Sequence, residues 1–373
     1  MKKLFLSILA MTGMAMGAHA QSWTMVVTNE DGTTQTFSTG KVKNVSFSVA
    51  DENVESIIIK EIYNGGCPLD EGTSFFQMDK GFILYNNSPK VAVANNLCVG
   101  IVDPMNAHAQ NNWYSNGSLT YSDYVPASNG IWYFQQPVIL QPYEQLVVSC
   151  NGAVDNTRTH SQSVNYADSS YYAMYDPEAG YTNTSYYPTP SDVIPTSHYL
   201  KAVEFGQGNA WLLSVMDPGL FIFQTKGTTP GEYANNNDNY VYAPGRQQTK
   251  VWRCLKVPVS WIVDGVEVWS KNYLTSCQKR FTHDVDNGHV DLTNKLGHSL
   301  YRNVDKTATE ALPENAGKLI YNYTLAVDEA ANGDNVIDAE ASIRKGAHIL
   351  YLDDNNSSTD FHERQHFSLR DTK

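Results

Sequence analysis

Charged residues are scarce in this sequence, and basic residues are the scarcer kind. Only 17% of the 373 residues are charged, with 26 Lys and Arg against 39 Asp and Glu, so the formal net charge is −13 at pH 7. An acidic surface of this kind repels phosphate backbones. The composition therefore argues against nucleic acid as a partner.

Beyond its N-terminus the sequence also lacks an apolar run of the ~20 residues that a membrane-spanning helix needs. The chain starts with Met1-Lys2-Lys3, continues with an apolar run over residues 4–16, and reaches the small residues of Ala18-His19-Ala20. This pattern is typical of a signal peptide cleaved after Ala20. We therefore predict an exported protein without a transmembrane segment, located in the periplasm, on the cell surface or outside the cell.

Cysteine is infrequent too, and no Cys-x-x-Cys pair occurs among the five that are present. An odd number of cysteines at wide spacings defines no disulfide framework, although an oxidising compartment permits bridges. Cys98, Cys150 and Cys254 stand beside apolar residues. We expect these three to be small, buried hydrophobic side chains.

Helical periodicity is scarce, whereas short β-branched and aromatic runs recur between turn-forming residues. Residues 57–63 and 81–88 are predicted to pair as strands, and the class is mainly β with few short helices. Residues 168–175 are expected to form a short helix capped by Asp168, and residues 103–130 a long exposed loop. Further strands are expected at residues 91–94, 97–102, 131–134, 138–140, 145–149, 210–215, 219–223 and 260–269.

These observations predict that the chain is divided into three segments. Residues 1–20 are the signal peptide, and residues 21–50 form a small N-terminal module built on a hairpin around Asp31-Gly32, with a third strand at 42–47. Residues 51–373 form the main domain, which carries an acidic insertion at about 305–344.

Six short pieces follow one another in a recognisable order: Ile59–Tyr63, Asp79–Ser88, Pro142–Glu144, Lys279–Phe281, Gly297–Arg302 and Asp354–Phe361. Together they resemble an uncharacterised family of exported Bacteroidales proteins whose domain is related to the lamin-tail, immunoglobulin-like β-sandwich. The resemblance implies such a sandwich, a place at the cell envelope and no known activity. Ile83 and Tyr143 depart from the pattern, which usually has an acidic residue and a glycine there, so we expect a different backbone geometry before Glu144.

Aromatic residues in the predicted loops form the first candidate site. Aromatic faces with asparagines nearby suit a neutral glycan or another envelope protein, although β-sheets also use aromatics for packing. The candidate ligand-binding residues are Trp113, Tyr114, Tyr121, Tyr124 and Trp132.

An oxygen-rich stretch near the C-terminus forms the second candidate site. Carboxylate and amide oxygens are the ligands that calcium takes, but the stretch lacks the full EF-hand spacing, and a turn capped by its own side chains is the alternative. The candidate calcium ligands are Asp353, Asp354, Asn356 and Asp360.

The segment His362-Glu363-Arg364-Gln365-His366 matches the H-E-x-x-H pattern of zinc hydrolases. On a helix the two histidines would share one zinc ion, with Glu363 as the general base and a third ligand from His283, His289 or His298. The neighbouring residues alternate as on a strand, where the histidines would lie about 13 Å apart. Gly297–Tyr301 lacks the second glycine of a nucleophile elbow around Ser299.

The sequence thus favours a non-catalytic binding or structural protein of the bacterial cell envelope, with a glycan or another envelope protein as its ligand. A zinc-dependent hydrolase built on His362, Glu363 and His366 is the alternative.

Overall fold

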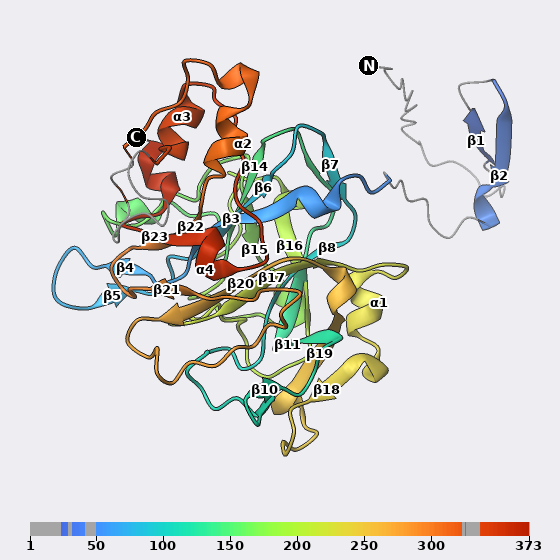
Figure 1. The fold of residues 1–373 in the computed structure, drawn as a ribbon. Coiled ribbons are helices and arrows are strands. Elements are labelled where there is room, and N and C mark those ends of the chain that lie inside the picture. Colours follow the sequence, from blue (N-terminus) through green and yellow to red (C-terminus); the bar gives the residue numbers. More distant parts are fainter. Residues whose placement is uncertain (1–23, 29–31, 42–49, 323–324, 326–335, 373) are drawn as a thin grey trace. The chain divides into compact units, whose positions relative to one another are not determined.

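The computed structural model describes residues 24–28, 32–41, 50–322, 325 and 336–372 (Figure 1). The chain divides into two compact units, Met1–Ser48 and Val49–Lys373. In the first unit, β1 (Thr24–Thr28) and β2 (Thr34–Ser38) pair in antiparallel fashion, which confirms the predicted hairpin. The predicted signal peptide and the predicted strand at 42–47 lie outside the described residues.

A mixed sheet of twelve strands is the centre of the second unit. Its neighbouring strands are antiparallel except for the pairs β14–β15, β15–β16 and β20–β21. In spatial order the strands are β21 (Val290–Leu292), β20 (Ile262–Ser270), β17 (Gly219–Gln224), β8 (Leu97–Ile101), β12 (Gly130–Tyr133), β16 (Tyr199–Glu204), β15 (Tyr172–Met174), β14 (Gln145–Ser149), β6 (Gly81–Asn86), β3 (Ile57–Tyr63), β22 (Ser299–Arg302) and β23 (Phe361–Arg364).

The two ends of this sheet approach each other, which makes the sheet nearly barrel-shaped (Figure 1). Side chains join them: Asp264 of β20 accepts the N–H of Ile59 on β3 at 2.6 Å. Glu363 of β23 accepts the N–H of Thr293, which follows β21, also at 2.6 Å. The mainly β class is therefore confirmed, whereas an immunoglobulin-like sandwich is not.

Smaller sheets surround the large one. The three-stranded sheet packs Val125 and Leu255 against Phe221 and Phe223 of β17 in a second hydrophobic core. The strands of the smaller sheets are β11 (Tyr124–Ser128), β19 (Arg253–Pro258) and β18 (Tyr240–Tyr242) in one, and in three pairs β9 (Tyr114–Ser115) with β10 (Ser118–Leu119), β7 (Ala92–Ala94) with β13 (Val138–Leu140), and β4 (Cys67–Pro68) with β5 (Phe75–Phe76).

A bulge in β3 explains how three of its isoleucines reach the main core. Residues on alternate positions of a strand face opposite sides, yet Ile57, Ile59 and Ile62 all lie in the main core. The register against β6 shifts between Ile59 and Glu61. The extra residue reverses the alternation, so Ile62 returns to the face that Ile57 and Ile59 occupy.

The described α-helices are short, and side-chain caps define their starts. Each has an N-cap oxygen that accepts a backbone N–H of its first turn, and the cap of α1 is a capping box between Thr229 and Glu232. No helix in the described ranges is long and apolar enough to cross a membrane. The helices are α1 (Pro230–Ala234), α2 (Lys306–Glu310), α3 (Ala339–Arg344) and α4 (Ser357–Asp360).

Several local predictions are wrong. Residues 168–175 form a turn and then β15, because Asp168 bonds the N–H of Ser170 at 2.9 Å and the following residues pair with β14 and β16. Residues 103–130 are no single exposed loop, since they contain β9, β10 and β11. Residues 210–215 form no strand. The predicted burial of Cys98, Cys150 and Cys254 is confirmed, and all five cysteines are free thiols.

The turn before Glu144 keeps the backbone geometry that a glycine would favour, so the expected change is wrong. Tyr143 has a φ of +60°, in the left-handed region that costs a non-glycine residue roughly 1–2 kcal/mol. Its ring stacks on His348 with 4.4 Å between the ring centroids.

Candidate functional site

The candidate site is a cleft at the tight turn between β11 and β12. Asn129 at this turn has a φ of +67°, which asparagine tolerates better than most residues. Its carbonyl accepts the N–H groups of Phe205 and Gly206 at 3.3 and 2.9 Å. Its side-chain nitrogen donates to the carbonyl of Ala210 at 3.1 Å. One asparagine thus fixes the turn against the loop of residues 205–210.

Glycines allow this loop to approach the turn closely. A Cβ atom on Gly206 would lie 2.5 Å from the Cα of Asn129, a distance that only glycine avoids. Gln207, Gly208 and Asn209 then follow as exposed residues. Among the residues that the structure describes, none accepts a hydrogen bond from the backbone N–H groups of these three residues.

An aromatic layer supports the cleft from within. The buried Trp132 ring stacks on Tyr181 with 5.2 Å between the centroids, at 23°. The Tyr181 hydroxyl donates to the carbonyl of Asn129 at 3.3 Å, and the Trp211 indole N–H donates to the carbonyl of Gly130 at 3.1 Å. The core therefore holds the β11–β12 turn rigidly in place.

The cleft has a volume of about 360 Å³, within the range of ligand sites of about 300–1,000 Å³. Asn183 joins two of its walls, because its N–H donates to the carbonyl of Asn209 at 3.1 Å. The described lining contains uncharged polar groups and apolar groups but no charged side chain. The lining residues are Met105, Ser128, Asn129, Asn183, Tyr186, Gly206, Gln207, Gly208, Asn209, Ala210, Leu212 and Val251.

Two charged groups next to these lining residues are already paired. Asp103 accepts the indole N–H of Trp113 at 2.8 Å and the hydroxyl of Ser128 at 3.4 Å. Burial raises the pKa of Asp103, which the hydrogen bonds from Trp113 and Ser128 oppose. Lys250 forms an ion pair with Glu204 at 2.9 Å. The cleft therefore offers a neutral environment to a ligand.

Three of the five predicted aromatic ligand residues lie inside the fold. Trp113, Tyr121 and Trp132 are buried, and Trp132 is fully so. Tyr114 and Tyr124 are partly exposed, but none of the five lines the cleft. Trp113 and Tyr121 pack together in one hydrophobic cluster and Trp132 packs in the main core, while ligand binding by these five residues stays a prediction.

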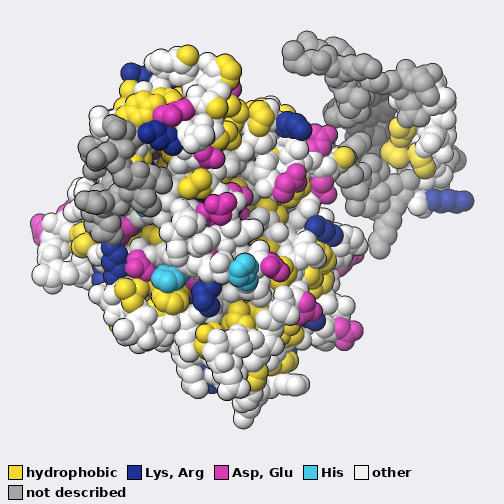
Figure 2. All heavy atoms as spheres, viewed as in Figure 1, with side chains coloured by type: hydrophobic (Ala, Val, Ile, Leu, Met, Phe, Trp, Pro, Cys, Tyr) yellow, Lys and Arg dark blue, Asp and Glu magenta, His cyan; other side chains and the backbone are white. Residues whose placement is uncertain are grey.

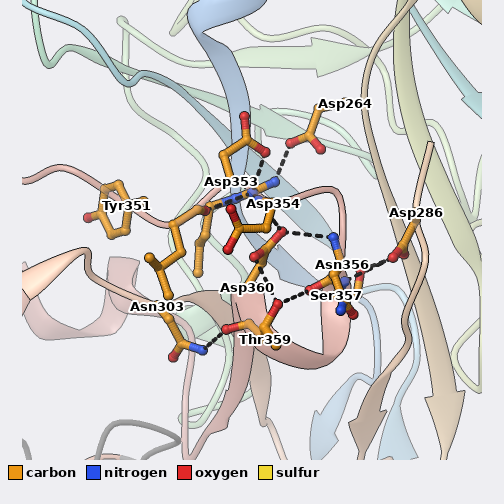
Figure 3. Close-up of polar contacts among 12 residues, drawn as sticks. Asp264, Asp286, Asn303, Tyr351, Asp353, Asp354, Asn356, Ser357, Thr359 and Asp360 are labelled. Atoms are coloured by element: carbon orange, nitrogen blue, oxygen red, sulfur yellow. Dashed lines mark hydrogen bonds and ion pairs between the residues drawn. The ribbon is translucent and has the colours of Figure 1, made fainter. Parts of the chain in front are cut away.

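The predicted calcium ligands Asp353, Asp354, Asn356 and Asp360 lie close together near α4 (Figure 3), and two of them, Asp353 and Asp360, form ion pairs with an arginine. Buried Arg302 forms ion pairs with Asp264, with Asp353 at 2.9 Å and with Asp360 at 3.7 Å. Asp360 also accepts the backbone N–H of Asp354 at 3.1 Å. Burial raises the pKa of Asp360, while its backbone hydrogen bonds and the Arg302 charge oppose that shift.

The remaining oxygens of this stretch shape the start of α4. Asn356 donates its backbone N–H to Asp360 at 3.0 Å and accepts the N–H of Ser358 at 3.1 Å. Ser357 donates its N–H to Asp286 at 2.8 Å (Figure 3). No group of three or more His, Cys, Asp or Glu side chains in the described ranges is arranged to hold a metal ion. Calcium at these residues stays a prediction.

The helix that the zinc alternative requires is not formed. Residues 361–364 are strand β23, paired with β22. His362 lies 2.6 Å from the side-chain oxygen of Asn303, and burial lowers its pKa to about 3. Burial raises the pKa of Glu363, but hydrogen bonds, the largest from His298, outweigh it and lower that pKa to about 2. His298, one of the proposed third ligands, lies 2.9 Å from Glu363.

Ser299, the serine of the incomplete nucleophile elbow, is fully buried in β22. Its hydroxyl donates to Glu61 at 2.5 Å. A substrate cannot reach a serine in this position.

Comparisons with known proteins add a family domain and a fold. Residues 141–326 match the family described as "Protein of unknown function (DUF4876)". A crystal structure of a DUF4876 family protein from Bacteroides thetaiotaomicron resembles this chain with a TM-score of 0.58 and 18% sequence identity, over 83% of this chain and 70% of that one. At this identity the likeness shows the fold alone. No curated protein matches the sequence.

Much of the cleft belongs to the matched family domain. Asn183, Tyr186, residues 206–210, Leu212 and Val251 of its lining fall within residues 141–326, while Met105, Ser128 and Asn129 precede it. Sequence reasoning missed these residues because single amides scattered over separate loops form no motif. Gly206-Gln207-Gly208-Asn209 was the available signal, since paired glycines mark a close approach of the backbone.

Proposed function

We propose that this protein is an exported, non-catalytic binding protein of the bacterial cell envelope and that its cleft holds a neutral glycan. The observation that carries the proposal is the uncharged, amide-lined cleft with the partly exposed ring of Tyr186 at its wall. Side-chain amides donate and accept hydrogen bonds as sugar hydroxyls require. An aromatic face provides the apolar contact for the C–H face of a sugar ring.

The lining also favours binding over catalysis. General acid–base chemistry needs a positioned Asp, Glu, His, Lys, Cys or Tyr side chain. Among the described lining residues Tyr186 is the single member of that group. A cleft of this composition holds a ligand without supplying an acid–base pair to transform it.

Export and the cell-envelope location rest on the predicted signal peptide over residues 1–20. Origin in the Bacteroidales and a distant relation to lamin-tail domains rest on the six resembling pieces. On the face in Figure 2, acidic and basic side chains are interspersed among uncharged atoms. The scarcity of charged residues, 17% of the chain, suits a neutral ligand.

A glycan array tests the proposal. The wild-type protein is expected to bind a set of neutral glycans, and Asn209→Ala is expected to weaken that binding about fivefold, the loss of one hydrogen bond. Asn237→Ala is the matched control, since Asn237 is an exposed amide outside the cleft. Binding to no neutral glycan, or equal binding by wild type and Asn209→Ala, would contradict the proposal.

A further inference from the structure

The cleft has four apolar side chains in its lining, which is more apolar surface than an unsubstituted sugar would cover. Met105, Ala210, Leu212 and Val251 line it together with the amides. Met105 and Leu212 pack with part of their surface on the main core, and Val251 is 52% exposed. Water left in contact with this apolar wall is unfavourable, so the ligand that fits best covers it with an apolar group.

A hexose presents its C–H groups on the faces of the ring, and one aromatic side chain suffices to cover such a face. Tyr186 is available for this contact. The separate aliphatic wall therefore calls for a methyl group that projects from the ring.

The amide groups of residues 207–209 further restrict the class of ligand that fits the cleft. The exposed backbone N–H groups of Gln207, Gly208 and Asn209 donate to none of the described residues, and neither do the side chains of Gln207 and Asn209. Gly208 has a φ of +106° with open space where a side chain would be. Backbone and side-chain amides next to an aliphatic wall complement an acetamido group, which combines a carbonyl acceptor, an N–H donor and a methyl group.

The absence of charged groups from the described lining excludes charged alternatives. A carboxylate or an ammonium group in this cleft would lose water without gaining an opposite charge, which is costly. Lys250 is engaged by Glu204, and Asp103 by Trp113. The ligand must be neutral as well as partly apolar.

We infer that the cleft selects glycans that carry a 2-acetamido sugar, with the acetamido methyl group against Leu212 and Val251 and its polar atoms toward residues 207–209. This inference rests on the proposed function. It adds the class of sugar that the same cleft prefers.

Calorimetric titration of the full chain with paired disaccharides tests it. Chitobiose and cellobiose have the same linkage and differ in the acetamido groups. Chitobiose is expected to bind about tenfold more tightly, the combined effect of one buried methyl group and one hydrogen bond. Val251→Thr keeps the shape of the side chain, lies at the surface and is expected to reduce this preference about threefold.

Val193→Thr is the control, because Val193 is 41% exposed and does not line the cleft. Leu212→Ala provides a second variant within the cleft, with the same expected direction. Equal affinities for the two disaccharides, no binding of chitobiose, or a preference that survives both cleft variants would overturn the inference. The glycan array decides the proposed function separately, since neutral glycans without acetamido groups can still bind there.

Discussion

At the scale of single residues, three of the five predicted aromatic ligand residues are buried in the fold. The composition predicts β structure correctly from Trp, Tyr and Phe, but it does not reveal which rings face solvent. Trp113 stands among polar residues in the sequence, yet tertiary packing buries it as completely as a core residue. The burial of the adjacent residues Lys60 and Glu61 was equally hidden, because nothing in the surrounding sequence marks a buried charge.

Replacing Trp132 is expected to destabilise the protein. Trp132→Ala leaves a cavity beside Tyr181 and is expected to lower the free energy of unfolding by about 3–5 kcal/mol. Trp132→Phe is expected to cost less, because the indole nitrogen has no hydrogen-bond partner among the described residues. Urea unfolding measures both variants, with Trp252→Ala as the partly exposed control. An unchanged unfolding midpoint for Trp132→Ala would refute the packing role.

The buried carboxyl of Glu61 is expected to make stability depend on pH. Burial raises the pKa of Glu61 from 4.5 to about 7, although the Arg364 charge opposes this. The folded state then binds more protons than the unfolded state between these values, so its stability falls as pH rises through 7. The difference between pH 4.5 and pH 8 is on the order of 3 kcal/mol.

The variant Glu61→Gln tests this linkage by urea unfolding at pH 5 and pH 8. It keeps an acceptor for Ser299 and is expected to lose less stability than wild type over that range. Glu71→Gln, at an exposed glutamate, is the control. A wild-type loss that persists in Glu61→Gln would show that another group titrates.

At the scale of elements, hydrophobic patterning located many strands, including β3 and β6, because each is a compact apolar run between turn residues. It failed where pairing partners are distant in sequence. β15 forms because β14 and β16 flank it in parallel, and a helix cap at Asp168 was the stronger local signal. Arg302 joins strands in the same non-local way, and no local pattern predicts its partners.

Removing the Arg302 charge is expected to weaken the junction between β20 and β22. Asp264 is buried, and Arg302→Met would leave its carboxylate without the guanidinium partner, at a cost of about 3–5 kcal/mol. The double variant Arg302→Met with Asp264→Asn is expected to recover part of that loss, since one of the carboxylates that lose the guanidinium is then neutral. Arg158→Met, which removes a largely exposed arginine, is the control. Equal stability of the single and double variants in urea would contradict this account.

At the scale of the whole molecule, the sequence predicts the mainly β class but not the cleft. Its walls come from residues 105, 128–129, 183, 186, 206–210, 212 and 251, which are distant in the sequence and meet only in the folded chain. The close approach of its two loops depends on Asn129, which has a positive φ, and on Gly206, which has no space for a side chain. Neither requirement is visible until the two loops are in contact.

The most direct test of the central claim is a crystal structure of the protein soaked with the neutral glycan that binds most tightly on the array. The account predicts ligand density between Tyr186 and the loop of residues 207–209, with a sugar ring against the tyrosine. Ligand density at a different surface, with only water in the cleft, would contradict it.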